Sequence, residues 1–406
     1  RDNAVSIFSS FFPIKLFFTT IAFIGMILLI VLNDYSQDVK TLIFVFSFYA
    51  IFTTITNFLF GFLKGHEKLQ YETKVSFTVN FGTLVILLFF VLNKTNIITI
   101  AIIFAITRFF GLLLTVYYTL RVQPNISFKI KLANYSKIIN QVLIFGLFLI
   151  FGNLYFQLDT ILLSFYKGES SVGIYQAVFR IVLLPLILPE VMINSILPVL
   201  SRNFNDNYIT WNLLGKTLNK FLLILGIPFF LGSFFFAENI INLIYVGKEY
   251  ALSIPVLKIF SLIILIRFYA ETFGLMLTTS GKQNYRMIIV VAATFINLAL
   301  NMYLIPSYGV IGAASVSLIT NIFVMFSFIL IQKNLFSNWS NNILNSNILY
   351  GFISMTLLFY LLTLVNLWYL SFLIVLGYLV FAYFKILSAS EKDFFSFFKN
   401  FKFTNN

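Results

Sequence analysis

The sequence predicts an all-α, polytopic bundle of membrane-spanning helices without a separate soluble domain. Of the 406 residues, 60% are hydrophobic and only 10% are charged, whereas soluble domains carry roughly 25% charged residues. Apolar stretches of about 20 residues, the length that crosses roughly 30 Å of hydrocarbon, recur from one end of the chain to the other. Because these stretches are continuous rather than alternating, they favour helices over the strands of a β-barrel.

The apolar stretches, taken in order, give about twelve spans joined by short connections. The longest connections are residues 121–137 on one side of the membrane and residues 236–253 on the other. The first half of the chain supplies the expected spans 14–32, 41–63, 75–92, 97–120, 139–165 and 173–200. The second half supplies the expected spans 213–236, 254–279, 287–305, 310–331, 348–365 and 368–387.

The placement of Lys and Arg orients the bundle, because cytoplasmic loops are enriched in these residues. Alternate connections, beginning at the first residue, hold about nineteen of them. The opposite connections hold only Lys40, Lys94, Lys167 and Lys248. We therefore expect both termini of the chain to be cytoplasmic. The net charge of +13 is then a signal of topology and of contact with an anionic lipid bilayer, not of nucleic-acid binding.

Several classes of chemistry are excluded by missing residues. The chain has no cysteine, which excludes thiol catalysis, disulfides and thiolate metal sites. Its one histidine, His66, lies in a predicted cytoplasmic turn, so neither a catalytic triad nor a metal site is expected. Gly215-Lys216-Thr217 lacks the upstream glycine of a phosphate-binding loop, because position 210 is Thr. We expect no catalytic residue, metal or cofactor, and any transport must use an ion, voltage or substrate gradient.

Charged residues inside the predicted spans are the candidate functional residues, because an ionisable group at membrane depth is costly without a task or a partner. Lys258 lies near the outer end of its span, where its long side chain can reach water, and we assign it no role. The full set is Arg108, Asp159, Arg180, Glu190, Lys258, Arg267 and Glu271.

Two pairs of opposite charge stand out in this set. Asp159 and Arg180 lie on the two arms of a predicted hairpin over residues 152–190, both about 10 Å from its turn. They could pair across the hairpin, or both could line one cavity. Arg267 and Glu271 are four residues apart and share a helix face. For each pair, simple mutual neutralisation is as good an explanation as a functional role.

Arg108 and Glu190 lack such an obvious local partner. Glu190 follows Pro185 and Pro189, which remove helix donors and would bend that span. A carboxylate at such a bend is a candidate H+ or Na+ site, or equally a neutral hydrogen-bonded acid. Uncharged polar side chains in the spans are interpreted mostly as interhelical hydrogen-bonding groups: Asn57, Asn80, Asn153, Gln157, Gln176, Asn194, Asn297 and Asn301.

Several short segments occur in a characteristic order. They are DTILLS at residues 159–164, VGIYQAVFRI at 172–181, LPVLSR at 197–202, YVGKEY at 245–250, the turn at Gly281, and NLALNMYLIPSYGVIGAA at 297–314. In this order and spacing they resemble the O-antigen and capsule flippases (Wzx-type), which are polysaccharide-biosynthesis proteins of the multidrug/oligosaccharidyl-lipid/polysaccharide (MATE-like) exporter superfamily. The resemblance covers essentially the whole chain and is strongest from Gly152 to Ser315.

The resemblance implies two pseudo-symmetric lobes around a central cavity that opens to each side in turn. Such proteins usually have about fourteen spans, so the resemblance implies that two are missing before Arg1. It divides the chain into a partial N-terminal lobe of four spans at 1–121, a cytoplasmic inter-lobe linker at 122–138, a C-terminal lobe of six spans at 139–331, and two appended spans with a cytoplasmic tail at 332–406.

The resemblance also implies a substrate, an undecaprenyl-diphosphate-linked oligosaccharide moved to the outer leaflet of the bacterial inner membrane. A diphosphate suits guanidinium groups, which bind phosphate with two parallel hydrogen bonds. We therefore expect Arg108, Arg180 and Arg267 to face the cavity and bind the diphosphate. The acids expected to couple transport to H+ or Na+, or to gate it, are Asp159, Glu190 and Glu271.

Three alternatives remain open. A multidrug antiporter of the same superfamily would favour acids over cations in its cavity, because its usual substrates are cationic. A lipid II flippase is a relative that the sequence separates poorly. A membrane glycan polymerase, ligase or acyltransferase commonly needs a sizeable exposed loop or a catalytic His or acid cluster, and the outer connection 236–253 is short and carries no His. A transporter rather than an enzyme is therefore predicted.

Overall fold

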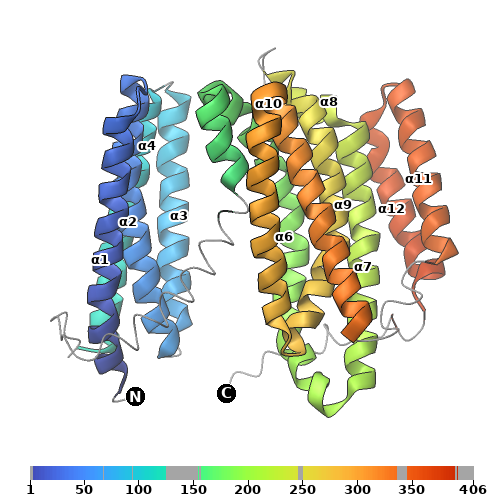
Figure 1. Cartoon of the computed structure of the whole chain (residues 1–406), viewed down its shortest axis with the longest axis horizontal. Coiled ribbons are helices and arrows are strands. Elements are labelled where there is room, and N and C mark those ends of the chain that lie inside the picture. The colour runs from blue at the N-terminus through green and yellow to red at the C-terminus, as the bar shows by residue number, and fades with distance from the viewer. Residues whose placement is uncertain are drawn as a thin grey trace. The chain divides into compact units, whose positions relative to one another are not determined.

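The computed structural model describes residues 3–66, 68–93, 95–124, 154, 157–245, 250–335, 345–388 and 391. All regular secondary structure among these residues is helical. The chain divides into two compact units, Arg1–Phe145 and Gly146–Asn406, whose helices are labelled in Figure 1. The all-α class expected from the continuous apolar stretches is thereby confirmed.

The described part of the first unit consists of long helices that run up and down in turn (Figure 1): α1 (Asn3–Leu32), α2 (Gln37–Gly65), α3 (Leu69–Leu92) and α4 (Ile97–Val122). Polar residues start two of them. The side chain of Ser36 accepts a hydrogen bond from the backbone N–H of Val39 at the start of α2, and Asn96 does the same for Ile98 at the start of α4. Such N-caps satisfy backbone donors that have no partner within the helix.

Side chains between the helices of this unit form a thin core. α2 packs against α1 and α4, and α3 packs against α4. Leu63 and Val75 are fully or almost fully buried between α2 and α3. An added Cβ at Gly111 would lie 3.0 Å from a methyl carbon of Val79, so the glycine allows α4 to approach α3 closely. Large apolar side chains such as Phe17 and Leu92 point outward, as expected where lipid rather than water surrounds a protein.

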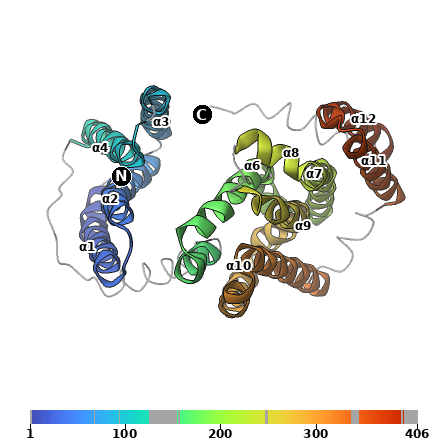
Figure 2. The same cartoon turned by 90° about the horizontal axis from the view of Figure 1, so that it is seen from above.

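The second unit is built around α9 (Ser253–Thr279), which Figure 2 shows between α6 (Glu169–Asp206), α7 (Tyr208–Phe235) and α10 (Gln283–Leu335). A helix at residues 157–167 precedes α6. The remaining elements are α8 (Ala237–Ile244), α11 (Ser346–Leu364), a short 3-10 turn η2 (Trp368–Leu370), α12 (Ser371–Phe381) and a π-helical turn η3 (Ala382–Ile386). α11 and α12 pack against α7.

A sharp kink at Gly309 divides α10 into two halves. Gly309 has φ 56° and ψ −130°, a conformation that only glycine adopts readily. At Gly312 an added Cβ would lie 2.6 Å from the backbone oxygen of Leu304, so the two halves meet closely just after the kink. The expected spans 287–305 and 310–331 correspond to these halves. In α6, by contrast, the helix is continuous across Pro185 and Pro189.

Ten helices in the described part of the chain are long and apolar enough to cross a membrane, with α10 counted once despite its kink. This agrees with the expected set of about twelve spans. Most of the expected span 139–165 and of the linker 122–138 lies outside the described residues. The finer division into a partial lobe, a linker, a second lobe and an appended pair stays a prediction.

Candidate functional site

Asp159 lies at the centre of a polar cluster in the second unit. Its side chain is only 2% exposed. One carboxylate oxygen, Oδ2, accepts hydrogen bonds from the hydroxyl of Tyr175 at 2.6 Å and from the hydroxyl of Ser317. The other oxygen, Oδ1, accepts from the amide Nδ2 of Asn297 at 3.0 Å and from that of Asn301 at 2.5 Å. Four neutral side chains therefore surround one carboxylate.

The kink in α10 builds this cluster. Asn297 and Asn301 are four residues apart on the first half of α10, so they share a face. Ser317 comes from the second half, after Gly309. The Nδ2 of Asn301 also contacts Oδ1 of Asn297 at 2.9 Å. The Oδ1 of Asn301 is buried without a hydrogen-bond partner among the described residues, which leaves an acceptor next to the carboxylate.

A small cavity of about 40 Å³ adjoins Asp159. A water molecule needs roughly 10–15 Å³ of such volume, so the cavity suits water or a small cation and is too small for a sugar. Its polar lining comes from Asp159, Arg267, Ser317, Thr320 and Asn321. Carboxylate, hydroxyl and amide oxygens are the ligands that hard cations prefer.

Arg267 lines the same cavity and forms the expected ion pair with Glu271, at 3.5 Å. Glu271 also lies 3.8 Å from Arg286, a residue that sequence reasoning did not select. Two guanidinium groups thus share one carboxylate.

Arg180 and Glu190 do not join the Asp159 cluster. Both side chains are exposed on α6, and Arg180 forms no ion pair with the described residues. Of the two alternatives for Asp159 and Arg180, the ion pair across the hairpin is not formed. The helical turn explains why: Arg180 is five residues after Tyr175, which places it about 140° around the helix from the residue that contacts Asp159. No observation tests a role of Arg180 or Glu190 with substrate.

Arg108 is the charged residue of interest in the first unit. It sits on α4, and its Nη2 donates a hydrogen bond of 3.1 Å to Oδ1 of Asn80 on α3. The guanidinium carbon lies 5.5 Å from the ring centre of Tyr49, in the range of a cation–π contact. Its Nε is buried without a hydrogen-bond partner, and no carboxylate in the described part of the chain pairs with it.

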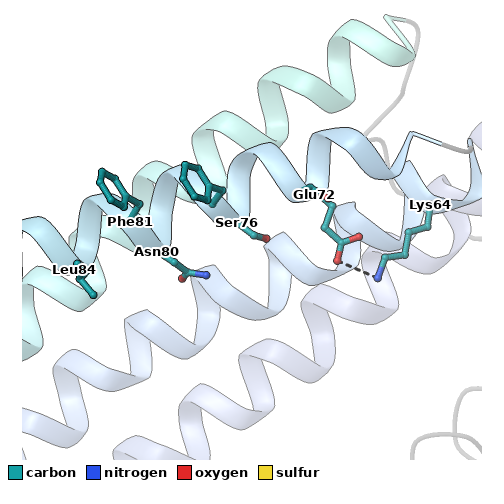
Figure 3. A pocket seen from close by; sticks show the side chains of 8 residues that line it. Lys64, Glu72, Ser76, Asn80, Phe81 and Leu84 are labelled. Atoms are coloured by element: carbon teal, nitrogen blue, oxygen red, sulfur yellow. Dashed lines mark ion pairs between the residues drawn. The ribbon is translucent and has the colours of Figure 1, made fainter. Parts of the chain in front are cut away.

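A wide groove of about 760 Å³ runs along α3 near this arginine. Figure 3 shows the ion pair between Lys64 and Glu72, 3.1 Å long, at one end of the groove. The lining residues are Lys64, Glu72, Thr73, Ser76, Phe77, Asn80, Phe81 and Leu84. The groove adjoins Arg108 through the Asn80 side chain.

Sequence reasoning missed part of the Asp159 cluster. Asn297 and Asn301 were interpreted as interhelical hydrogen-bonding groups, which they are, although their shared partner is the candidate acid. Their four-residue spacing was a usable signal. Tyr175 and Ser317 were not selected, and no local pattern identifies Ser317, because its contact with Asp159 depends on the turn of the chain at Gly309.

Two proteins of known name are similar to part of this chain. A chain of Haloferax volcanii named "Probable flippase AglR" is 30% identical over 173 residues, 41% of this chain and 35% of the relative. "Probable low-salt glycan biosynthesis flippase Agl15" of the same organism is 23% identical over 165 residues, 40% of this chain and 34% of the relative. The matched part spans about a third of the length of these relatives.

The fold is that of known transporters. A structure described as the lipid II flippase MurJ in an inward closed conformation superposes with a TM-score of 0.72, covering 94% of this chain and 83% of that one at 17% identity. At this identity the likeness shows the fold alone. A family model described as MatE matches residues 143–303, and one described as polysaccharide biosynthesis protein matches residues 2–204, half of the chain. The chain is a multi-pass membrane protein and belongs to the polysaccharide biosynthesis protein family.

Proposed function

We propose that this protein is a flippase rather than an enzyme. It moves an undecaprenyl-diphosphate-linked oligosaccharide, the repeat unit of an O-antigen, capsule or exopolysaccharide, from the cytoplasmic to the outer leaflet of the bacterial inner membrane by alternating access. Membership of the polysaccharide biosynthesis family and the names of the two relatives support this proposal.

The observation that carries the proposal is the environment of Arg108. The residue lies about 17 Å along α4 from its first residue, Ile97, which is membrane depth. Its guanidinium group is held by an amide and an aromatic ring, and neither neutralises the charge. A cation in a poorly screened site attracts an anion strongly. A diphosphate supplies that charge and the paired oxygens that a guanidinium group binds best.

Arg180 and Arg267 are proposed to contact the diphosphate during the same transport cycle. Arg180 is exposed and has no ion-pair partner in the described part of the chain. Arg267 pairs with Glu271 and lines the small cavity beside Asp159, and a diphosphate would give its guanidinium group a further anionic partner. Glu271 is then a gating acid, because its ion pairs must rearrange whenever Arg267 turns to substrate.

Asp159 is proposed as the group that couples transport to H+ or Na+. Its carboxylate accepts hydrogen bonds from neutral side chains, and the small adjoining cavity has room for a cation. If the amides of Asn297 and Asn301 turned, they would present oxygens to a sodium ion. Protonation would instead turn the Tyr175 or Ser317 hydroxyl away. Glu190, exposed on α6, is kept as a second candidate for gating.

The test is transport in vesicles that contain the purified protein and a fluorescent undecaprenyl-diphosphate-linked sugar. Arg108→Ala should slow the initial rate roughly tenfold to a hundredfold, the loss expected for charge-assisted hydrogen bonds. Arg108→Lys should recover part of it, because it keeps the charge but not the paired hydrogen bonds. Lys258→Gln is the control, since Lys258 is an exposed cation in α9 without an assigned role. Wild-type rates in Arg108→Ala would refute the diphosphate role.

Two other classes of transporter are alternatives to this function, and the same vesicle assay distinguishes them by their substrates. The match to the MatE model makes a multidrug antiporter the first, and transport of a cationic dye would support it. Arg108 argues against it, because an unneutralised guanidinium group repels a cation. A lipid II flippase is the second, and lipid II offered as the competing substrate distinguishes it.

A further inference from the structure

The exposed face of α3 has two edges of different chemistry. Residues 72, 76, 80 and 84 recur every four positions and line one edge of the groove, while residues 73, 77 and 81 line the neighbouring edge. Figure 3 shows Glu72, Ser76 and Asn80 on one side of α3 and the ring of Phe81 on the other. A ligand lying over this face would meet polar groups along one side and aromatic rings along the other.

The polar edge offers hydrogen bonds of several kinds. Glu72 uses Oε1 to pair with Lys64 at 3.1 Å, whereas its Oε2 is buried without a hydrogen-bond partner among the described residues and reaches a ligand only when the side chain turns toward the groove. Ser76 adds a hydroxyl group, which can donate and accept. Asn80 adds an amide whose oxygen already accepts from Arg108. A carboxylate, a hydroxyl and an amide in a row form a surface suited to the hydroxyl groups of a sugar.

The aromatic edge carries two stacked, exposed rings. The rings of Phe77 and Phe81 are nearly parallel, with an interplanar angle of 8° and ring centres 5.7 Å apart. Their side chains are 68% and 57% exposed. Aromatic faces pack against apolar surfaces and carry a negative quadrupole that attracts polarised C–H groups. The C–H face of a pyranose ring presents such a surface, while its edge carries hydroxyl groups.

Lipid alone does not explain this face. Asn80 lies inside the expected span 75–92, where an amide that faces acyl chains is costly, while Glu72 lies in the first turn of α3 and pairs with Lys64. The volume of about 760 Å³ falls within the roughly 300–1,000 Å³ of small-molecule sites. We propose that this face of α3 binds the sugar residues of the transported glycan, with the exposed rings of Phe77 and Phe81 as its aromatic edge and Glu72, Ser76 and Asn80 as its hydrogen-bonding edge. The inference rests on the proposed function and adds to it the site that recognises the saccharide.

The link between Asn80 and Arg108 sets the direction of the glycan. Arg108 holds the diphosphate at the Asn80 end, and the sugars extend along α3 toward Glu72 and the Lys64 ion pair. Glu72 and Asn80 are eight residues apart, which is about 12 Å of helix. The sugars nearest the diphosphate are therefore the ones that the groove selects.

The test compares two lipids on the purified full chain in detergent. One is the lipid-linked glycan, extracted from cells in which it accumulates because they lack this protein. The other is undecaprenyl diphosphate without sugar. The wild type should bind the glycan-bearing lipid more tightly. Phe77→Leu with Phe81→Leu keeps apolar side chains but removes both rings, and should lower affinity for the glycan-bearing lipid roughly tenfold. Affinity for undecaprenyl diphosphate should not change.

Matched variants separate binding from folding. Phe89→Leu alters another exposed phenylalanine of α3, 65% exposed and outside the groove lining, and should leave both affinities unchanged. Glu72→Gln keeps the side-chain shape and should weaken only the glycan-bearing lipid. If the double variant keeps the wild-type preference for that lipid, the saccharide site is wrong and the proposed function stands. If the wild type binds neither lipid, both the saccharide site and the proposed function are wrong. If it binds both equally, the saccharide site alone is overturned.

Discussion

Asn301 donates a hydrogen bond of 2.5 Å to the carboxylate of Asp159, although the two residues are 142 positions apart in the chain. This contact joins the helix at residues 157–167 to the first half of α10. The other carboxylate oxygen accepts from Tyr175 of α6 and from Ser317 of the second half of α10. Asp159 is therefore bonded to three segments of the second unit: α6 and the two halves of α10. A change of charge at Asp159 therefore acts directly on all three.

The first prediction concerns Asp159→Asn, which keeps the size of the side chain and removes its charge. If Asp159 binds the coupling ion, the variant should still equilibrate lipid-linked sugar between leaflets but should no longer respond to an imposed gradient. The measurement is transport in vesicles with an Na+ gradient, with a pH gradient and with neither.

Ser315→Ala is the control for this variant. Ser315 lies on the same half of α10 as Ser317, but it is half-buried and its hydroxyl donates to the backbone oxygen of Ile311 in its own helix. It should respond to the gradients as the wild type does. An Asp159→Asn protein with the full gradient response would assign the coupling ion to another group, with Glu190 and Glu271 as the next candidates.

The fold followed from the sequence because the length and composition of an apolar stretch determine whether it spans a membrane. The Arg267–Glu271 pair followed because i,i+4 contacts are local. The sequence left open whether Asp159 and Arg180 pair, and the structure shows no such pair, since equal depth on a hairpin does not place two side chains on facing sides of their helices. The position of Ser317 beside Asp159 could not be predicted, because it depends on the backbone angles of one distant glycine.

The second prediction tests that glycine. Gly309→Ala should destabilise the protein, because a non-glycine residue in this region of backbone angles costs about 1–3 kcal/mol. For a chain of this size the melting temperature should fall by roughly 1–4 °C. The gradient response should weaken as well, because the kink separates Asn301 from Ser317 in the chain and brings both to Asp159.

Gly173→Ala is the matched control for the kink. Gly173 is a helical glycine of α6 without a neighbouring atom within 4 Å of an added Cβ. Alanine there should leave the melting temperature unchanged or raise it slightly, because alanine favours helix. Equal melting temperatures for Gly309→Ala and the wild type would mean that α10 can adopt other backbone angles at position 309 without loss of stability.

The third prediction concerns the ion pair between Lys220 of α7 and Glu391, which attaches the segment after η3 to the second unit. The Nζ of Lys220 lies 2.9 and 3.1 Å from the two carboxylate oxygens of Glu391, and the backbone N–H of Ser388 donates to Oε2 at 2.8 Å. Burial alone would raise the pKa of Glu391, but the hydrogen bond from Ser388 and the charge of Lys220 outweigh it. The pKa is therefore lowered from its ordinary value of 4.5.

A lowered pKa in the folded state sets the sign of the pH dependence. The contribution of Glu391 to stability is present in full above pH 4.5 and is lost as the pH falls through the lower folded value. Glu391→Gln should therefore melt below the wild type at pH 7, and the difference should disappear in acid. Asp206→Asn, which alters an exposed carboxylate at the end of α6, should show no such convergence. A Glu391→Gln difference that stays constant from pH 7 to acid would mean that packing, and not the charge of the carboxylate, attaches this segment.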